Sequence, residues 1–169
     1  KKKSTELKVL FLLSKFEYGV NIDELAKVVD KISQIGNSKV LIKPHTRGMQ
    51  IKNFVSNLKN KDVVIDFETN SNQLIEDSDI IFFTGTSIIF QALILKKKII
   101  FLKNCLFWDS IFDSSNIFKV KNLDQINSDI FNISNDFNGL DEFLCENVFN
   151  NIKSGLVSSN LIKHLDENK

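Results

Sequence analysis

The feature that most constrains the fold of this chain is a regular alternation between short apolar runs and amphipathic stretches. Residues 8–14, 39–44, 63–68, 79–85 and 98–103 are rich in β-branched and aromatic side chains, as buried strands are. Between them, apolar residues recur every three or four positions, which is the spacing of a helix with one buried face. In the first such stretch these apolar positions are Ile22, Leu25, Val28, Val29, Ile32 and Ile35. The pattern predicts strands that alternate with helices.

Local signals indicate where helices begin and end. Asn21 is a typical N-cap residue and Gly36 a typical terminator, so a helix is expected between them. Further helices are expected at 49–59, 71–78 and 86–97, and the pattern is helical again from 140 onward. A weaker strand and helix, at 117–122 and 123–131, continue the alternation.

Strands that are apolar on both faces are typical of a parallel sheet covered on both sides, with right-handed crossovers through the helices. We therefore expect an α/β fold: a Rossmann-like parallel sheet of about six strands with flanking helices and a helical carboxyl terminus. No repeat and no Pro- or Ser-rich linker divides the chain, so residues 1–169 are expected to form a single domain.

Charge and cysteine content limit the partners. The chain has 22 basic and 21 acidic residues, a balance that argues against non-specific nucleic-acid binding. Cys105 and Cys145 lie far apart and form no metal-binding pattern, which fits a reducing, cytoplasmic location. No apolar run approaches the roughly 20 residues of a membrane span. The chain does not begin with Met, and we expect it to be part of a longer protein.

Ligands of such sheets bind at the carboxyl ends of the strands, where loops lead into helices. Four loops are expected to meet there, at residues 14–21, 43–48, 68–71 and 84–87. The second of these, KPHTRG, holds the only Pro and the only Arg of the chain. An Arg side chain offers a planar pair of donors that matches phosphate oxygens, although a solvated turn is the alternative interpretation.

The loop TGTS at 84–87 is the other strong candidate. Gly85 permits close backbone approach, and the first amides of a helix are unpaired. The hydroxyls of Thr84, Thr86 and Ser87 add donors, unless they only cap the helix. Two such loops at one edge predict a site for a phosphate or diphosphate.

Two segments within residues 39–103 have a recognisable pattern: VLIKPHTR, and LIEDSDIIFFTGTSIIFQALILKKKIIFL. They resemble the carboxyl-terminal, donor-binding domain of GT-B glycosyltransferases. The similarity is greatest to the branch with capsule-polysaccharide transferases, CDP-glycerol glycerophosphotransferases and bacterial sialyltransferases. The resemblance implies binding of a nucleotide-activated sugar or polyol phosphate for surface-polysaccharide or cell-envelope assembly. It implies no metal or other cofactor, and it places the acceptor site and the catalytic base in an amino-terminal domain outside this chain.

The resemblance also assigns candidate site residues. Together with the analysis of the two loops, it implies that the donor phosphates are bound by Lys43, His45, Arg47, Thr84, Gly85, Thr86 and Ser87. It implies that the nucleoside is bound by Glu68, Thr69 and Gln91. In the full protein, contact with the inner face of the cytoplasmic membrane is an open alternative to a location free in the cytoplasm.

The sequence departs from the family pattern at three places. Pro44 precedes His45 where relatives have His-Pro, Gln91 stands where relatives often carry Glu, and Lys97 and Lys98 replace Gly and Pro. These departures suit an alternative function, in which the chain is a nucleotide-binding module without catalytic activity. A UDP-sugar 2-epimerase is a further alternative that shares the fold, although such enzymes typically carry an acid near the position of Gln91.

Other signals point to weaker alternatives. Thr84 and Lys103 suit a receiver-like signalling domain, but the strand at 8–14 is not followed by the acidic cluster which that class needs. Residues 77–79 spell Asp-Ser-Asp, yet they precede a strand and so lie at the wrong edge for a metal-nucleotide motif. Four apolar residues cluster after the strand at 98–103, where packing is favoured over a base-stacking wall: Phe107, Trp108, Ile111 and Phe112. Dinucleotide and P-loop motifs are missing.

Overall fold

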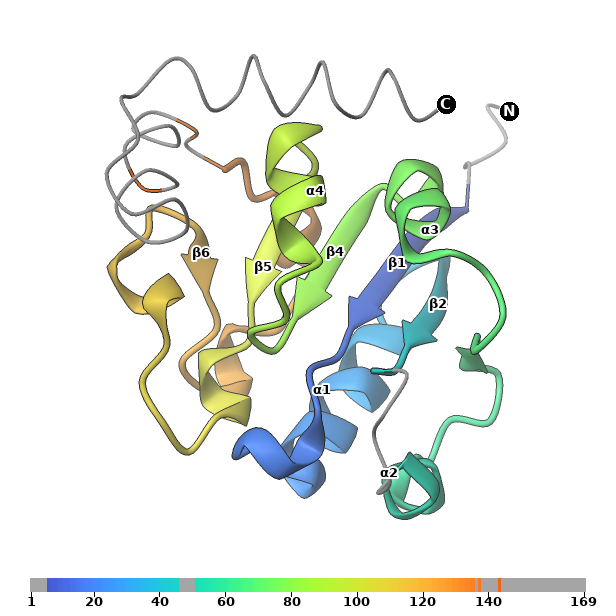
Figure 1. Ribbon diagram of the computed structural model, residues 1–169. Helices are drawn as coiled ribbons and strands as arrows, with labels where there is room; N and C mark the ends of the chain where they lie inside the picture. Colours follow the sequence, from blue (N-terminus) through green and yellow to red (C-terminus); the bar gives the residue numbers. More distant parts are fainter. Residues whose placement is uncertain (1–5, 46–50, 136, 138–142, 144–169) are drawn as a thin grey trace.

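The expected parallel sheet is confirmed. The computed structural model describes residues 6–45, 51–135, 137 and 143, and within them six strands pair in the order β3-β2-β1-β4-β5-β6, every pair parallel (Figure 1). The strands are β1 (Leu7–Leu12), β2 (Ser38–Lys43), β3 (Val64–Ile65), β4 (Ile80–Phe83), β5 (Lys98–Phe101) and β6 (Phe118–Lys119). This order reverses direction between β1 and β4, as in doubly wound Rossmann-like sheets.

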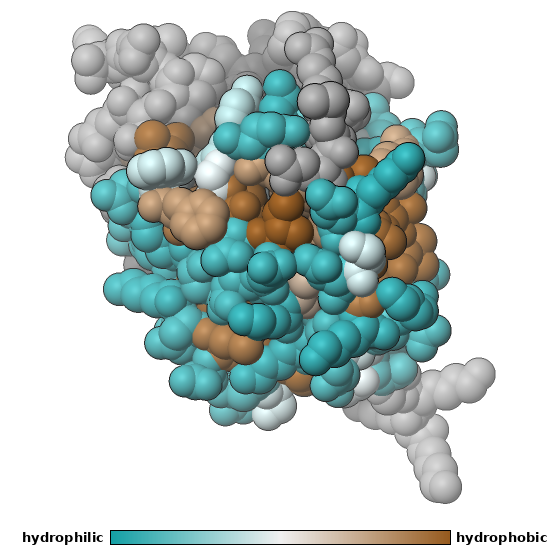
Figure 2. All heavy atoms as spheres, turned by 90° about the horizontal axis from the view of Figure 1, so that it is seen from below, coloured by the Kyte–Doolittle hydropathy of each residue, from teal (hydrophilic) through white to brown (hydrophobic). Residues whose placement is uncertain are grey.

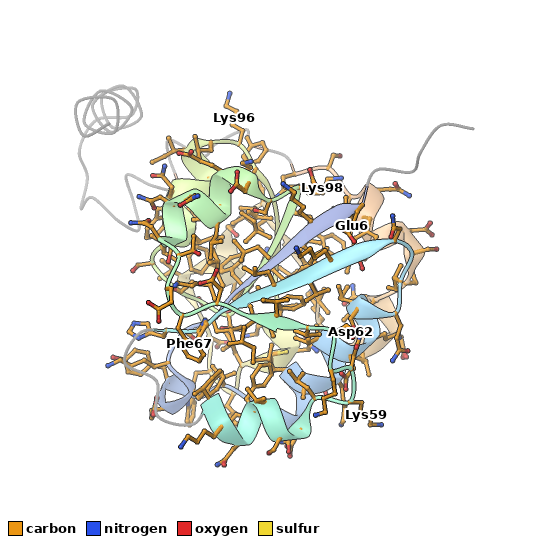
Figure 3. The ribbon with its side chains drawn as sticks, turned by 90° about the vertical axis from the view of Figure 1, so that its right-hand side faces the viewer. Glu6, Lys59, Asp62, Phe67, Lys96 and Lys98 are labelled. Carbon is orange, nitrogen blue, oxygen red and sulfur yellow. The ribbon has the colours of Figure 1, made fainter. Side chains whose placement is uncertain are left out.

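Helices cover both faces of the sheet. They are α1 (Ile22–Ser33), α2 (Ile51–Asn57), α3 (Ser71–Asp77) and α4 (Ile89–Ile94). Figure 3 shows α3 and α4 on one side of the sheet and α1 and α2 on the other. Successive β1 side chains point to opposite faces, so Val9 and Phe11 pack in the core beneath α1 and α2, whereas Leu10 and Leu12 pack beneath α3 and α4.

Two local signals read from the sequence have different outcomes. The N-cap at Asn21 is confirmed, because its side-chain oxygen accepts a hydrogen bond from the Glu24 amide at 3.1 Å. The expected helix end at Gly36 is wrong: α1 ends at Ser33, and Gly36, with φ of 63°, lies in the turn before β2.

Several elements are shorter than expected. The two edge strands, expected at 63–68 and 117–122, have two residues each. After β3 the Asp66 carboxylate accepts hydrogen bonds from two following amides, so the chain turns away from the sheet. Residues 123–131 form 3₁₀ turns rather than a helix, since the side chains of Asn122 and Asn127 bind nearby amides. Apart from residue 143, the helices expected from 140 onward lie outside the described residues.

The C-terminus of α4 places a lysine where glycine is usual. Lys96 has φ of 50° and donates its amide to the Leu93 carbonyl, while the Lys97 amide donates to the Ala92 carbonyl. This hydrogen-bond pair is the Schellman motif, whose left-handed residue is most often Gly. Within the described residues, Lys96 is the one non-glycine residue with positive φ, and it directly precedes Lys97 and Lys98, which replace Gly and Pro of the family pattern.

Replacing Lys96 with Gly should raise the free energy of unfolding by about 1 kcal/mol, because Gly adopts the left-handed conformation without a Cβ penalty. Urea unfolding of the full chain measures this change. Lys96→Ala is the matched control, since it removes the same charge and keeps the Cβ. Equal stability of the two variants would contradict the explanation.

Candidate functional site

The carboxyl ends of the strands form the edge where the candidate loops meet. The strands point toward the lower side of Figure 1, and Figure 2 views the molecule from there. That face is largely hydrophilic, with apolar side chains near its middle and along one side. Because β1 pairs with both β2 and β4, the loops that follow these three strands are neighbours.

A pocket of about 190 Å³ lies between the loops after β2 and β4, and we call it the first pocket. Its lining consists of Leu12, Leu13, Lys43, Pro44, His45, Ser71, Thr86, Ser87 and Ile88. Four predicted phosphate-binding residues from two distant segments thus surround one cavity: Lys43, His45, Thr86 and Ser87. Arg47 lies outside the described residues.

Lys43 brings a buried positive charge to this pocket. Its side chain is only 6% exposed, and Nζ donates a hydrogen bond to the Phe67 carbonyl at 2.9 Å. A buried ammonium group is stable only if its protons find acceptors. Since an ammonium group has three protons, Lys43 can bind a further acceptor from within the pocket while it holds Phe67.

The loop after β3 is held by Asp66. Its carboxylate accepts hydrogen bonds from the amides of Glu68 and Thr69 at 2.9 and 2.8 Å. Hydrogen bonds from the Thr69 side chain and amide lower the pKa of Asp66; the Glu68 amide and the Lys43 charge act the same way and outweigh burial. Phe67, which is 56% exposed, lies at this edge, opposite Glu6 and Lys98 (Figure 3).

The predicted nucleoside-binding residues are not part of the first pocket. Glu68 is exposed, Thr69 and Gln91 are half-buried, and none of the three contributes to its lining. Ser71, the first residue of α3, does line it. Sequence reasoning placed Ser71 in a candidate loop but did not select its hydroxyl, although the start of a helix at this edge was a usable signal.

Thr84 differs from the expectation that its hydroxyl would bind an anion. It is 1% exposed, and its Oγ1 accepts a hydrogen bond from the Ser14 amide at 3.0 Å and lies 3.1 Å from Ser14 Oγ. The hydroxyl is used inside the protein because β1 and β4 are adjacent, so that these two residues face each other where their strands end.

A helix was expected to begin at Thr86. Instead, Thr86 and Ser87 lie in a turn that precedes α4. The amides of Ile89 and Phe90 donate to the carbonyls of Thr86 and Ser87, three residues earlier, and α4 begins only at Ile89. Gly85, with φ of 83°, allows the chain to turn here. Among the described residues, the hydroxyls of Thr86 and Ser87 have no hydrogen-bond partner, so they are available to a ligand.

A second pocket of about 140 Å³ lies among the loops after β1, β4 and β5, and the sequence did not predict it. Its lining consists of Ser14, Tyr18, Thr84, Gly85, Leu106, Trp108, Asp109 and Ser110. The expectation that the apolar cluster after β5 is packed is wrong for Phe107, Trp108 and Ile111, which are 65%, 70% and 45% exposed. It holds for Phe112, which is buried against Phe83 and Phe101.

Ion pairs hold the loop after β5 in place. Lys103 Nζ lies 2.8 Å from an Asp109 oxygen and 2.9 Å from an Asp113 oxygen, and these hydrogen bonds raise the pKa of Lys103. Burial alone would raise the pKa of Asp113, but the Ser110 amide and the Lys103 ammonium together lower it.

The opposite edge of the sheet contains the Asp-Ser-Asp motif, as expected. Asp79 accepts a hydrogen bond from the Lys8 amide at 2.8 Å, near the amino end of β1. Among the described residues, no group of three His, Cys, Asp or Glu side chains could hold a metal ion. Within residues 6–45 and 51–135, no helix has the length and apolar character needed to cross a membrane.

The loops after β1 and β5 are joined at Gly19. The Phe107 amide donates to the Gly19 carbonyl at 2.9 Å, and Val20 forms a β-bridge with Leu106. A Cβ added at Gly19 would lie 2.2 Å from two atoms of the Trp108 ring.

Substituting Ala for Gly19 should displace the Trp108 ring and change the fluorescence of this only tryptophan. Gly36→Ala is the matched control: Gly36 also has positive φ, but nothing lies within 4 Å of its added Cβ. Both variants should lose about 1 kcal/mol of stability from backbone strain. Emission spectra that are the same for both variants would contradict the described contact.

Comparison with solved structures supports the fold. No protein-family model and no curated protein matches the chain. The spinosyn rhamnosyltransferase SpnG aligns over 83% of this chain and 37% of its own, with a TM-score of 0.54 and 12% identity. A putative UDP-N-acetylglucosamine 2-epimerase from Listeria monocytogenes aligns over 85% of this chain and 37% of its own, with a TM-score of 0.52 and 9% identity.

The wall teichoic acid polymerase TagF aligns over 98% of this chain and 45% of its own, with a TM-score of 0.44 and 17% identity. The chain thus spans less than half the length of these proteins. At such identities the likeness concerns the fold alone, and it rests on SpnG and the epimerase. The expected resemblance to the donor-binding domain of GT-B glycosyltransferases is confirmed at the level of the fold.

Proposed function

We propose that this chain is the donor-binding domain of a GT-B glycosyltransferase, and that its first pocket binds the phosphates of a nucleotide-activated sugar or polyol phosphate. The observation that carries the proposal is the meeting of Lys43 and His45 with Thr86 and Ser87 around one cavity. A buried cation and two available hydroxyls are suitable partners for a phosphate oxygen.

This arrangement also suits the chemistry of group transfer. When a glycosyl or polyol phosphate group leaves a nucleotide donor, negative charge develops on the departing phosphate. Donors that are already fixed stabilise that charge without reorganising. Lys43 is fixed by its bond to Phe67 and by its burial, so it would act in this way.

The size of the pocket limits what it can hold. Sites that enclose a whole small molecule usually measure about 300–1,000 Å³. This cavity, at about 190 Å³, is smaller than such sites, so we assign the phosphates to it. The nucleoside is proposed to lie outside this pocket, and Glu68, Thr69 and Gln91 are the residues proposed to bind it. Arg47 is proposed to add charge to the phosphate site.

Solved structures lend support to a nucleotide ligand. SpnG has been solved with thymidine diphosphate, and that complex aligns with this chain at a TM-score of 0.53 and 12% identity. Because the chain spans less than two fifths of SpnG, the acceptor site and the catalytic base are proposed to lie in a domain outside it. We further propose that the transfer needs no metal ion and serves surface-polysaccharide or cell-envelope assembly. It would take place in the cytoplasm or at the inner face of the cytoplasmic membrane.

A second candidate is a UDP-sugar 2-epimerase, favoured by the 2-epimerase among the similar structures. It would use the same phosphate pocket and differ in its chemistry. Gln91 favours transfer, because an amide cannot supply the acid expected near this position. A nucleotide-binding module without catalysis would share the pocket as well.

Replacing Lys43 with Met should weaken binding of the preferred nucleotide at least tenfold, since a charge-assisted hydrogen bond contributes about 1.5–3 kcal/mol. Ser87→Ala should weaken it by roughly threefold to tenfold, the effect of one neutral hydrogen bond. Calorimetric titration of the full chain with CMP, CDP, UDP and GDP measures both changes and identifies the base.

The matched control is Lys97→Met. Lys97 Nζ also donates to backbone carbonyls, those of Glu76 and Ser78, but away from the pocket. Thermal unfolding of each variant checks that the domain stays folded. Affinity that falls equally in Lys43→Met and Lys97→Met would refute the assignment of the site.

A further inference from the structure

A pair of buried polar residues, Ser14 and Thr84, lines the second pocket. Ser14 follows β1 and Thr84 follows β4, and they are 6% and 1% exposed. Three contacts join them: Ser14 N to Thr84 Oγ1 at 3.0 Å, Ser14 Oγ to the Thr84 carbonyl at 2.8 Å, and Ser14 Oγ to Thr84 Oγ1 at 3.1 Å.

The protons of this pair can be assigned because each hydroxyl has only one. The Ser14 hydroxyl donates to the Thr84 carbonyl, which can only accept. In the contact between the two hydroxyls, Thr84 Oγ1 must therefore donate to Ser14 Oγ. The Ser14 amide donates to Thr84 Oγ1, so both hydroxyl protons are used inside the pair.

The pair is placed to fix the loop after β4. Ser14 and Thr84 line the second pocket, while their neighbours Leu13 and Thr86 line the first. The Thr84 carbonyl belongs to the peptide that leads into Gly85, the residue with positive φ at which the loop turns. Holding that carbonyl fixes the direction in which the next residues leave the strand.

The fold does not need these contacts in order to place the strands. Residues 9–12 of β1 already pair in register with residues 80–83 of β4. In addition, the Thr84 amide donates to the Leu12 carbonyl at 3.3 Å. The contacts made by the Ser14 and Thr84 side chains act one step beyond the strand ends, on the loops alone.

We propose that Ser14 and Thr84 are positioning residues for anion binding: they lock the loops after β1 and β4 together, so that Thr86 and Ser87 face Lys43 across the first pocket. This inference rests on the proposed function, since it assumes that the first pocket binds phosphate. It assigns Thr84 an indirect role in place of the direct contact expected from the sequence.

The test is calorimetric titration of the full chain with inorganic pyrophosphate and with the preferred nucleotide. Ser14→Ala and Thr84→Val each remove hydrogen bonds from the lock, and each should weaken binding about tenfold. Thr84→Ser keeps the hydroxyl and should bind within about twofold of the unmodified chain. Ser56→Ala is the control, because the Ser56 hydroxyl donates to the Asn53 carbonyl on exposed α2, away from both pockets.

A double variant distinguishes positioning from general weakening of the fold. If the lock acts through the loop, Ser87→Ala should cost less affinity in the Ser14→Ala background than in the unmodified chain. Thermal unfolding of each variant separates lost stability from lost affinity, and Thr84→Ser keeps the test valid if Thr84→Val fails to fold.

Each outcome has a definite meaning. Absence of binding to the unmodified chain would overturn the proposed function and this inference together. Binding by Ser14→Ala and Thr84→Val as tight as that of Ser56→Ala would overturn the inference and leave the proposed function in place. Equally weak binding by Thr84→Ser and Thr84→Val would also overturn it, because the hydroxyl would then have no part.

Discussion

The structure depends on the parallel pairing of β1 with two neighbours at once. Residues 9–12 are at most 1% exposed, with alternate side chains in the cores on the two faces of the sheet. Because β2 pairs on one side and β4 on the other, the chain order reverses at β1. Loops that are separated by some forty residues are thereby brought to one edge, and both pockets lie beside the end of this strand.

Polar groups at that edge fall into two kinds. One kind forms hydrogen bonds within the protein and so fixes the loops; its members are Ser14, Thr84 and Asp66. The hydroxyls of Thr86 and Ser87 donate no hydrogen bond to another described residue. The Lys43 ammonium group has three protons and donates one of them to the Phe67 carbonyl. The first kind fixes the loops, and the second kind lines the first pocket without a described partner for every donor. The distinction depends on which partners the fold supplies, since serine and threonine occur in both groups.

Much of the fold could be predicted from the sequence. Runs that are apolar on both faces indicate a parallel sheet, and the periodicity of residues 22–35 indicates the buried face of α1, because both patterns reflect simple backbone repeats. Element ends were harder to predict. The early end of β3 depends on the Asp66 carboxylate, and the late start of α4 depends on the turn at Gly85, so each follows from a few local contacts.

The sequence by itself determined the parallel sheet and indicated that the segments after β2 and β4 meet at one edge, as residues 43–45 and 86–88 do. Tertiary structure alone decided which side chains in those loops remain available. Thr84 and Thr86 are two positions apart and chemically identical, yet Ser14 binds one hydroxyl and leaves the other to the pocket. A residue seventy positions away makes that difference, so no local pattern could have shown it.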